Sequence, residues 1–299
     1  MRFKIIVLSV LFISLNNLYA QNDGAGNTGL SFLKLGVGAR SIAMGEAFSS
    51  FTDDASAIVY NPARLLNGAK NNVLLMHNSG AQDLSNDFIG AKISSDKFAL
   101  GFGIIKSGVN NIEIRLLPGP AIDKFNSENL AISLGGAFKL NDYISIGLTA
   151  KFLYEKYYVD EASGTGFDFG TSYSKDNTNF SFVLSNLGSM NPLKNESTKL
   201  PTSVRFGGSY IIPSHDFNFA IAVDGFKVLN GGLFHIHTGG EAAYKDFVFV
   251  RLGYQSNYEN KGFTTGLGFK YKGINLDYAF IPYTSAFGTG NTFSLGVTF

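Results

Sequence analysis

The sequence ends in TFSLGVTF, residues 292–299, and the alternation in this stretch indicates the architecture of the whole chain. Successive side chains of an extended strand point to opposite faces, so Phe293, Leu295, Val297 and Phe299 share one face and Thr292, Ser294, Gly296 and Thr298 share the other. One apolar face and one small, polar face are what surrounding lipid and a packed or wet lumen demand. A soluble β-sandwich also alternates, but its polar face usually carries more charge.

The same period of two runs from residue 71 to residue 299, which predicts an all-β fold. Short polar turns near 94–97, 140–142, 175–177, 213–216, 245–246 and 272–273 alternate with longer links at 78–86, 107–127, 155–164, 188–201, 226–231, 257–261 and 283–290. Outer-membrane barrels have short periplasmic turns and long external loops. The segments so bounded predict a closed transmembrane antiparallel β-barrel of about 14 strands, and we interpret 111–117 as loop.

Composition narrows the class of protein. The 299 residues include 28 Phe, 14 Tyr and 35 Gly but no Cys or Trp. Charged residues make up 16%, against roughly 25% in typical soluble domains. The net charge of +1 gives no bulk field for nucleic acid, so we expect no nucleic-acid partner. The absence of Cys excludes disulfides and thiolate metal sites, and we expect no cofactor.

The N-terminus predicts export. Arg2 and Lys4 precede an apolar run over 5–15, and Ala20 offers a small residue at a cleavage site. This order is typical of a secretory signal peptide, residues 1–20, and the run is shorter than the ~20 residues that a membrane-spanning helix needs. A buried or anchoring helix is the alternative. The exported chain either floats in the periplasm or medium, or enters the outer membrane of a Gram-negative cell, where lipid surrounds the barrel.

Residues 21–70 differ from the barrel region, residues 71–299. A polar leader over 22–28 is followed by a Gly-rich apolar segment without clean alternation. Asp53 and Asp54 are placed to cap a short helix over 55–60, which Asn61-Pro62 would end. Capping, or an ion pair with Arg40, is favoured over acid–base catalysis by the two neighbouring carboxylates. The sequence therefore predicts a plug, or hatch, at the barrel mouth.

The plug region carries a recognisable motif. It reads Gly38-Ala39-Arg40, Ala43-Met44-Gly45-Glu46-Ala47, Asp53-Asp54 and Tyr60-Asn61-Pro62-Ala63-Arg64-Leu65. This motif resembles the N-terminal signature of the PorV/PorQ family, within the wider FadL-like group of outer-membrane barrels. The family pattern has Gly where this chain has Glu46 and Arg64. The resemblance marks as hatch residues Gly38, Arg40, Met44, Gly45, Asp53, Asp54, Asn61 and Pro62.

The resemblance also implies functions. PorV-like members work with the type IX secretion system, where the barrel binds translocon or attachment-complex proteins and the C-terminal sorting domains of exported cargo. FadL-like relatives instead move hydrophobic small molecules inward, which is the alternative function. A purely structural barrel is a third reading. The small, polar residues at inward positions such as Ser133, Gly135, Ser145, Gly147 and Thr149 weigh modestly against an apolar lumen, although small residues also make room for a plug.

Two further features suggest partners. The 107–127 link carries the apolar residues Ile112, Ile114, Leu116, Leu117 and Pro118, so it is the candidate partner-binding loop. A lid folded over the barrel mouth is equally compatible with this link. The terminal Phe299 and its alternating neighbours resemble the signal that barrel assembly machinery reads on a last strand.

No arrangement of residues indicates an enzyme or a metal site. His235, His237 and Glu241 share the inward face of one expected strand, but Glu241 lies about 20 Å from His235 at 3.3 Å per residue. These residues are therefore interpreted as polar lumen lining. The sequence contains no G-x-S-x-G or H-E-x-x-H motif.

Overall fold

The computed structural model describes residue 24, residues 26–284 and residues 287–299, and its main body is a closed antiparallel β-barrel of 14 strands, as predicted. The predicted signal peptide lies outside these residues. The barrel strands are β1 (Asn71–Ser79), β2 (Leu84–Ser94), β3 (Phe98–Ile114), β4 (Asp123–Lys139), β5 (Ile144–Tyr157), β6 (Asp160–Lys175), β7 (Thr178–Met190), β10 (Ser203–Pro213), β11 (Phe217–Val228), β12 (Phe234–Tyr244), β13 (Val248–Gln255), β14 (Phe263–Tyr271), β15 (Ile274–Pro282) and β16 (Thr289–Thr298).

The first and last strands close the ring. β1 pairs with β2 on one side and with β16 on the other, in a register that places Val73 opposite Val297 and Leu75 opposite Leu295. The remaining strands pair with their sequence neighbours, and β7 pairs directly with β10. Closure satisfies the backbone donors and acceptors without leaving a sheet edge, which a wall surrounded by hydrocarbon requires.

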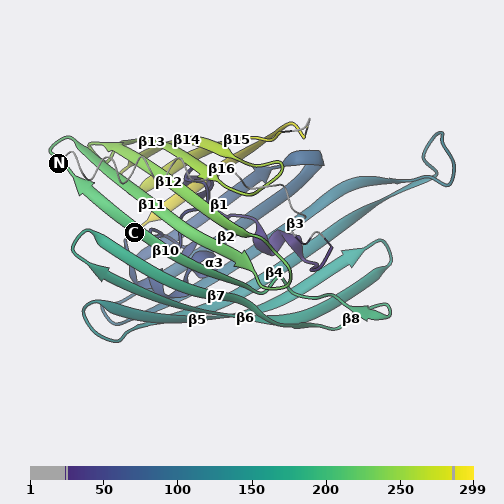
Figure 1. Cartoon of the computed structure of the whole chain (residues 1–299), viewed down its shortest axis with the longest axis horizontal. Helices are drawn as coiled ribbons and strands as arrows, with labels where there is room; N and C mark the ends of the chain where they lie inside the picture. The colour runs from purple at the N-terminus through teal and green to yellow at the C-terminus, as the bar shows by residue number, and fades with distance from the viewer. Residues whose placement is uncertain (1–23, 25, 285–286) are drawn as a thin grey trace.

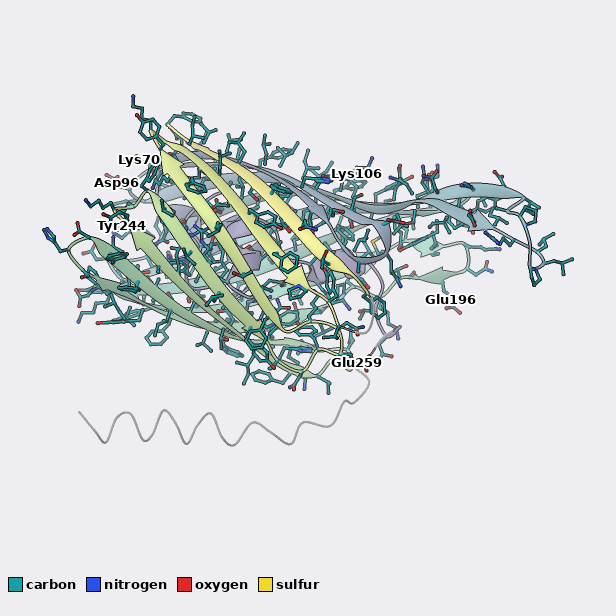
Figure 2. The ribbon with its side chains drawn as sticks, turned by 90° about the horizontal axis from the view of Figure 1, so that it is seen from above. Lys70, Asp96, Lys106, Glu196, Tyr244 and Glu259 are labelled. Atoms are coloured by element: carbon teal, nitrogen blue, oxygen red, sulfur yellow. The ribbon has the colours of Figure 1, made fainter. Side chains whose placement is uncertain are left out.

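The two faces of the wall separate as the alternation predicts. Leu148 on β5 is 63% exposed on the outside, whereas Thr149 beside it is 1% exposed and faces the lumen. Aromatic side chains ring the end of the barrel that carries the short turns, which we call the short-turn end: Phe98, Phe138, Tyr143, Tyr173, Phe217, Tyr244, Phe247 and Tyr271. Such girdles mark the membrane interface of β-barrels. Tyr244 lies at this end, and Glu196 and Glu259 lie at the opposite, long-loop end (Figure 2).

The interpretation of 107–127 as a loop is wrong. β3 continues to Ile114 and pairs with β4 from Asp123, so most of the link is a strand pair that projects beyond the barrel (Figure 1). We call residues 107–127 the arm. The alternation was hidden because the register shifts between Val109 and Ile112, where Asn111 has a φ of 58°. A bulge of this kind adds a residue to one strand and interrupts its period.

The long link expected at 155–164 is also wrong, because β5 and β6 meet in a tight turn at Tyr158-Val159. Tyr158 has a φ of 58°, a turn conformation that sequence alternation does not reveal. The expected 188–201 link is present, and it carries the small hairpin β8 (Pro192–Leu193) and β9 (Glu196–Ser197).

Short helices lie between the leader and the barrel. They are η1 (Ser31–Lys34), α2 (Ala39–Ala43), α3 (Ala57–Tyr60) and η2 (Pro62–Leu66), and a further turn, η3 (Ala81–Asp83), joins β1 to β2. α3 ends before Asn61-Pro62, as predicted. In the described part of the chain, no helix is long and apolar enough to cross a membrane.

Candidate functional site

The plug, residues 30–66, lies inside the barrel. α2 packs against β13, β14, β15 and β16, whereas η2 packs against β2 to β6 on the other side. Its apolar side chains, including Met44, Phe48 and Ile58, are fully buried. The segment therefore crosses the lumen from one wall to the other (Figure 1).

Glycines on the inner wall let the plug backbone dock directly onto the strands. A Cβ added to Gly253 on β13 would lie 2.0 Å from the Gly45 nitrogen, and one on Gly239 of β12 would lie 2.4 Å from the Met44 oxygen. On the opposite wall, a Cβ on Gly147 would lie 2.4 Å from the Ala63 nitrogen. The small inward residues thus serve plug packing, which is the explanation that the sequence left open.

Gly239→Ala is expected to destabilise plug docking because the added methyl group overlaps Met44. Overpacking of this kind costs about 1–3 kcal/mol. Gly240→Ala is the matched control, since its Cβ would meet only the Ala220 oxygen at 3.8 Å. We expect protease to cleave the plug faster in Gly239→Ala and at the wild-type rate in Gly240→Ala. Equal cleavage of both variants would contradict the close docking of plug on wall.

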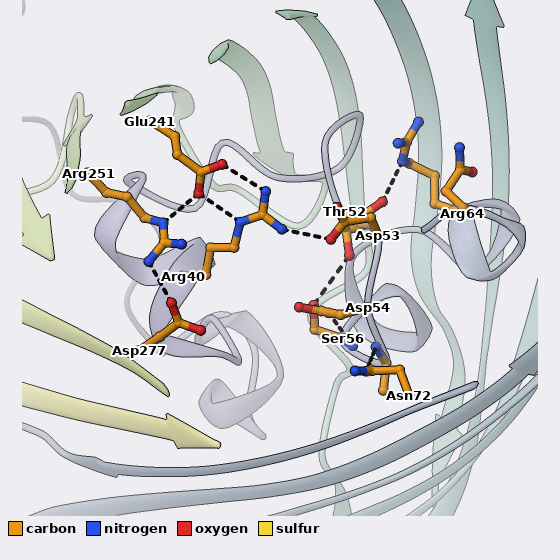
Figure 3. Close-up of polar contacts among 12 residues, drawn as sticks. Arg40, Thr52, Asp53, Asp54, Ser56, Arg64, Asn72, Glu241, Arg251 and Asp277 are labelled. Carbon is orange, nitrogen blue, oxygen red and sulfur yellow. Dashed lines mark hydrogen bonds and ion pairs between the residues drawn. The ribbon is translucent and has the colours of Figure 1, made fainter. Parts of the chain in front are cut away.

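Arg40 joins the plug to the wall through charge. Its guanidinium forms two hydrogen bonds with Glu241 on β12, at 2.8 and 2.9 Å, and contacts Asp53 at 2.7 Å (Figure 3). Arg251 on β13 contacts Glu241 at 2.6 Å and Asp277 on β15 at 2.7 Å. The ion pair between Arg40 and Asp53 that the sequence suggested is present, and it belongs to a larger chain of alternating charges. We call Arg40, Asp53, Glu241, Arg251 and Asp277 the clamp.

Aromatic rings complete a closed layer beside the clamp. The Arg40 guanidinium carbon lies 5.5 Å from the ring centroid of Phe48 and 4.9 Å from that of Phe51. Phe48 also meets Tyr60 edge-to-face at 5.5 Å, and the Tyr60 hydroxyl donates to Ser41 at 2.9 Å. These residues fill the middle of the lumen.

The two neighbouring aspartates do not face one substrate position. Asp53 contacts Arg40, whereas Asp54 accepts hydrogen bonds from the Ser56 nitrogen at 2.8 Å and the Ser56 hydroxyl at 2.5 Å. Burial, with a further contribution from the Asp53 charge, raises the pKa of Asp54. The arrangement holds the start of α3 in place.

The opposite end of the plug is held by Asn61 and Arg64. The Asn61 amide donates to the Ser49 oxygen at 3.1 Å and to the Thr171 oxygen at 3.0 Å, tying the plug to β6. Arg64 donates to the Thr52 oxygen at 2.7 Å, and burial lowers the pKa of its guanidinium to about 10. Arg64, one of the two departures from the family pattern, is therefore a buried anchor.

Further charged pairs on the inner wall were not singled out from the sequence. Lys151 contacts Asp168 at 2.7 Å between β5 and β6, and Arg205 contacts Asp224 at 3.3 Å between β10 and β11. Asp224 also accepts from the Phe48 and Ser49 nitrogens of the plug. In the sequence, such pairs could have been found by looking for charged residues at inward positions of an alternating strand.

Hollows lie on both sides of the plug. At the short-turn end, a hollow of about 510 Å³ is lined by the clamp together with Phe51, Ile211 and Phe249. At the long-loop end, the outer hollow of about 230 Å³ is lined by Leu35, Phe226, Val228, His235 and Tyr258. An inner hollow of about 40 Å³, bordered by Glu46 and Tyr60, shares Lys34, Leu35 and Phe226 with the outer one.

The histidines belong to the outer part of the lumen. His237 Nε2 lies 3.0 Å from the Tyr258 hydroxyl, and the His235 ring stacks on Tyr258 at 3.9 Å. Glu241 contacts the clamp arginines instead. Among the residues that the structure describes, no group of three or more His, Cys, Asp or Glu side chains is placed to hold a metal ion.

The remaining predicted site residues lie apart from the plug. On the arm, Leu116 and Leu117 are 82% and 79% exposed, and Ile112 and Ile114 are half-buried. Pro118 is exposed at the arm tip. Phe299 is exposed beside β1, where its nitrogen donates to the Asn71 oxygen at 3.3 Å.

Solved structures share this fold. The monoaromatic hydrocarbon channel CymD matches with a TM-score of 0.61 and 12% identity, over 88% of this chain and 98% of that one. The toluene transporter TodX of Pseudomonas putida matches with a TM-score of 0.61 and 14% identity, over 87% of this chain and 96% of that one. No protein-family model and no curated protein matches the sequence.

These comparisons test the fold that the sequence motif implied, but not the narrower family. The neighbours are FadL-like hydrocarbon-channel barrels, and the 14-stranded barrel fold that the motif implied is confirmed. The narrower PorV/PorQ resemblance rests on the sequence motif alone.

Proposed function

We propose that this chain is an outer-membrane channel for hydrophobic small molecules and that the plug is its gate. The observation that carries the proposal is the pair of hollows on opposite sides of the plug, about 230 Å³ and about 510 Å³, separated by the layer of Phe48, Phe51, Tyr60 and Arg40. Support also comes from the fold shared with proteins described as a hydrocarbon channel and a toluene transporter.

The route for a solute follows from these positions. Phe226, Leu35 and Val228 offer apolar surface in the outer hollow, and Ile211 and Phe249 offer it at the short-turn end. Between the two hollows lie the buried rings of Phe48 and Tyr60. We expect passage to require the plug to shift against the wall, so plug mobility is the property to test.

A reversible disulfide cross-link between the plug and the wall tests whether the plug must move. The Ser49 and Ser181 hydroxyls lie 2.8 Å apart, one on the plug and one on β7, which is close enough for a disulfide after substitution by cysteine. Because the chain has no Cys, Ser49→Cys/Ser181→Cys would form a single, defined cross-link. We expect intact cells carrying the oxidised variant to lose saturable toluene uptake, and reduction to restore it.

The matched controls are the two single-cysteine variants, which should take up toluene equally with and without reductant. Equal uptake by oxidised and reduced double variant would contradict a moving gate. Uptake no greater than in cells lacking the chain would contradict the channel itself.

The arm favours a second candidate function, a partner-binding component of type IX secretion, as the PorV/PorQ resemblance implies. Leu116, Leu117 and Ile122 are exposed at its tip, beyond the barrel, and apolar surface of this kind is typical of contact sites. Gentle detergent extraction tests this function. Recovery of translocon, attachment or sorting-domain proteins, lost on substitution of both leucines by serine, would support it, whereas recovery of the barrel alone would not.

A further inference from the structure

Glu46 occupies a position that is unfavourable for a glutamate. Its φ is 60°, directly after Gly45 at 64°, and left-handed backbone of this kind favours glycine. The side chain is 7% exposed, and a Cβ added to Gly36 would lie 2.9 Å from the Glu46 carboxyl carbon. The carboxylate is thus held inside the lumen, against the plug backbone.

The Glu46 carboxylate differs from the other buried carboxylates of the lumen. Asp168, Asp224 and Glu241 each contact a basic side chain, and Glu155 accepts from the Thr198 hydroxyl. Within the described residues, Glu46 makes no side-chain hydrogen bond and no ion pair. The Glu46 oxygens are therefore free to accept a hydrogen bond from a donor that enters the lumen.

The inner hollow shows where such a partner would sit. Glu46 borders it together with the small polar residues Ser133, Ser185 and Ser203. Its volume of about 40 Å³ is enough for a water-sized polar group, and the shared residues Leu35 and Phe226 lead outward to the larger hollow. An elongated solute can therefore place a polar end at Glu46 and an apolar body in the outer hollow.

The charged side chains around the inner hollow determine which polar group of a solute can bind at Glu46. Lys34, Lys151 and Arg205 line the same hollow, so an ammonium ion would be repelled, and Glu46 itself would repel a carboxylate. A neutral hydroxyl donates to Glu46 and accepts from Lys34. A pure hydrocarbon would leave the carboxylate unpaired, and sites built to bind a hydroxyl discriminate strongly against analogues that lack it.

We infer that Glu46 recognises the hydroxyl of a small phenol, whose ring lies in the outer hollow against Phe226 and Leu35. This inference rests on the proposed channel function and narrows its substrate class. The phenol hydroxyl donates its hydrogen to the carboxylate without transferring it, and an apolar substituent of the ring points toward the long-loop end.

Two solutes of equal shape test the inference. p-Cresol and p-xylene differ only by a hydroxyl in place of a methyl group, and their binding to the full mature chain can be measured by calorimetry in one detergent. We expect the wild-type chain to prefer p-cresol by about 10-fold or more, as a hydrogen bond to a charged group provides. Partition into micelles cancels when variants are compared in the same detergent.

The informative variants are Glu46→Gly and Glu46→Gln. Glycine suits the positive φ and removes the buried charge, so Glu46→Gly should fold at least as stably, which thermal unfolding checks. It should bind p-xylene as the wild type does but lose the preference for p-cresol. Glu46→Gln keeps the shape and an acceptor oxygen, so it should retain part of the preference.

The outcomes separate the two proposals. If the wild type binds p-xylene but the p-cresol preference is absent, or is unchanged in Glu46→Gly, the role of Glu46 is wrong and the channel function stands. If the wild type binds neither solute, both are wrong.

Discussion

Arg40→Ala is expected to lower the unfolding free energy by ~3–5 kcal/mol and to release the plug from β12 and β13. Removing one partner of a buried ion pair leaves an uncompensated charge, which is the origin of this cost. Here the charge left behind is on Glu241, which is 7% exposed and keeps only Arg251. Asp53 is 42% exposed, so its lost contact adds little. The stacking of Arg40 over Phe48 and Phe51 is lost as well.

Two measurements check this expectation. Denaturant unfolding in detergent reports the free energy, and conductance across a planar bilayer reports whether the lumen opens. The matched control is Arg115→Ala on the arm, where the arginine is 48% exposed and pairs with a similarly exposed Glu113. Surface pairs contribute ~0–1 kcal/mol, so the control should resemble the wild type. A wild-type conductance and stability for Arg40→Ala would show that the clamp does not hold the plug.

Leu148→Arg is expected to block insertion into the membrane at a cost of roughly 2–4 kcal/mol. Leu148 faces outward on β5, between Tyr143 toward the short-turn end and Tyr154 toward the long-loop end. This position lies near the middle of the apolar band, where a guanidinium has neither water nor counter-ion. The fraction of chain recovered as heat-resistant barrel in the outer-membrane fraction measures the effect.

Leu117→Arg provides the same substitution at a different depth. Leu117 is 79% exposed, comparable to the 63% of Leu148, but it lies at the tip of the arm, beyond the barrel wall. This variant should assemble like the wild type. Normal assembly of Leu148→Arg would mean that β5 does not present this face to lipid.

The barrel was predictable because its wall obeys one rule over its whole length. Each strand separates an apolar face from a small or polar one, as at Leu148 and Thr149, so the strand count and the direction of each face follow from the order of residues. The arm and the tight turn at Tyr158 were missed because a bulge or a residue with positive φ interrupts that order locally.

The plug was predictable as a segment but its contacts were not. Arg40 and Asp53 are close in sequence, and the motif relates them, whereas Glu241 and Asp277 reach Arg40 and Arg251 only through the curvature of the barrel. Likewise, alternation places Gly239 on the inward face with His237 and Glu241, but it does not reveal that Gly239 meets Met44 of the plug. Such pairings depend on shear and tilt, which alternation does not encode.

The seam between β1 and β16 has a consequence for biogenesis. The plug precedes β1 in the chain, and β16 is the final strand, so the cylinder is sealed by its two extreme strands. We expect the plug, residues 30–66, to dock before β16 pairs with β1. In the closed barrel, the plug packs against strands on both sides of the lumen. Plug docking would then precede barrel closure in every newly made chain. Substitutions that disrupt the plug would give barrels in which β1 and β16 do not pair.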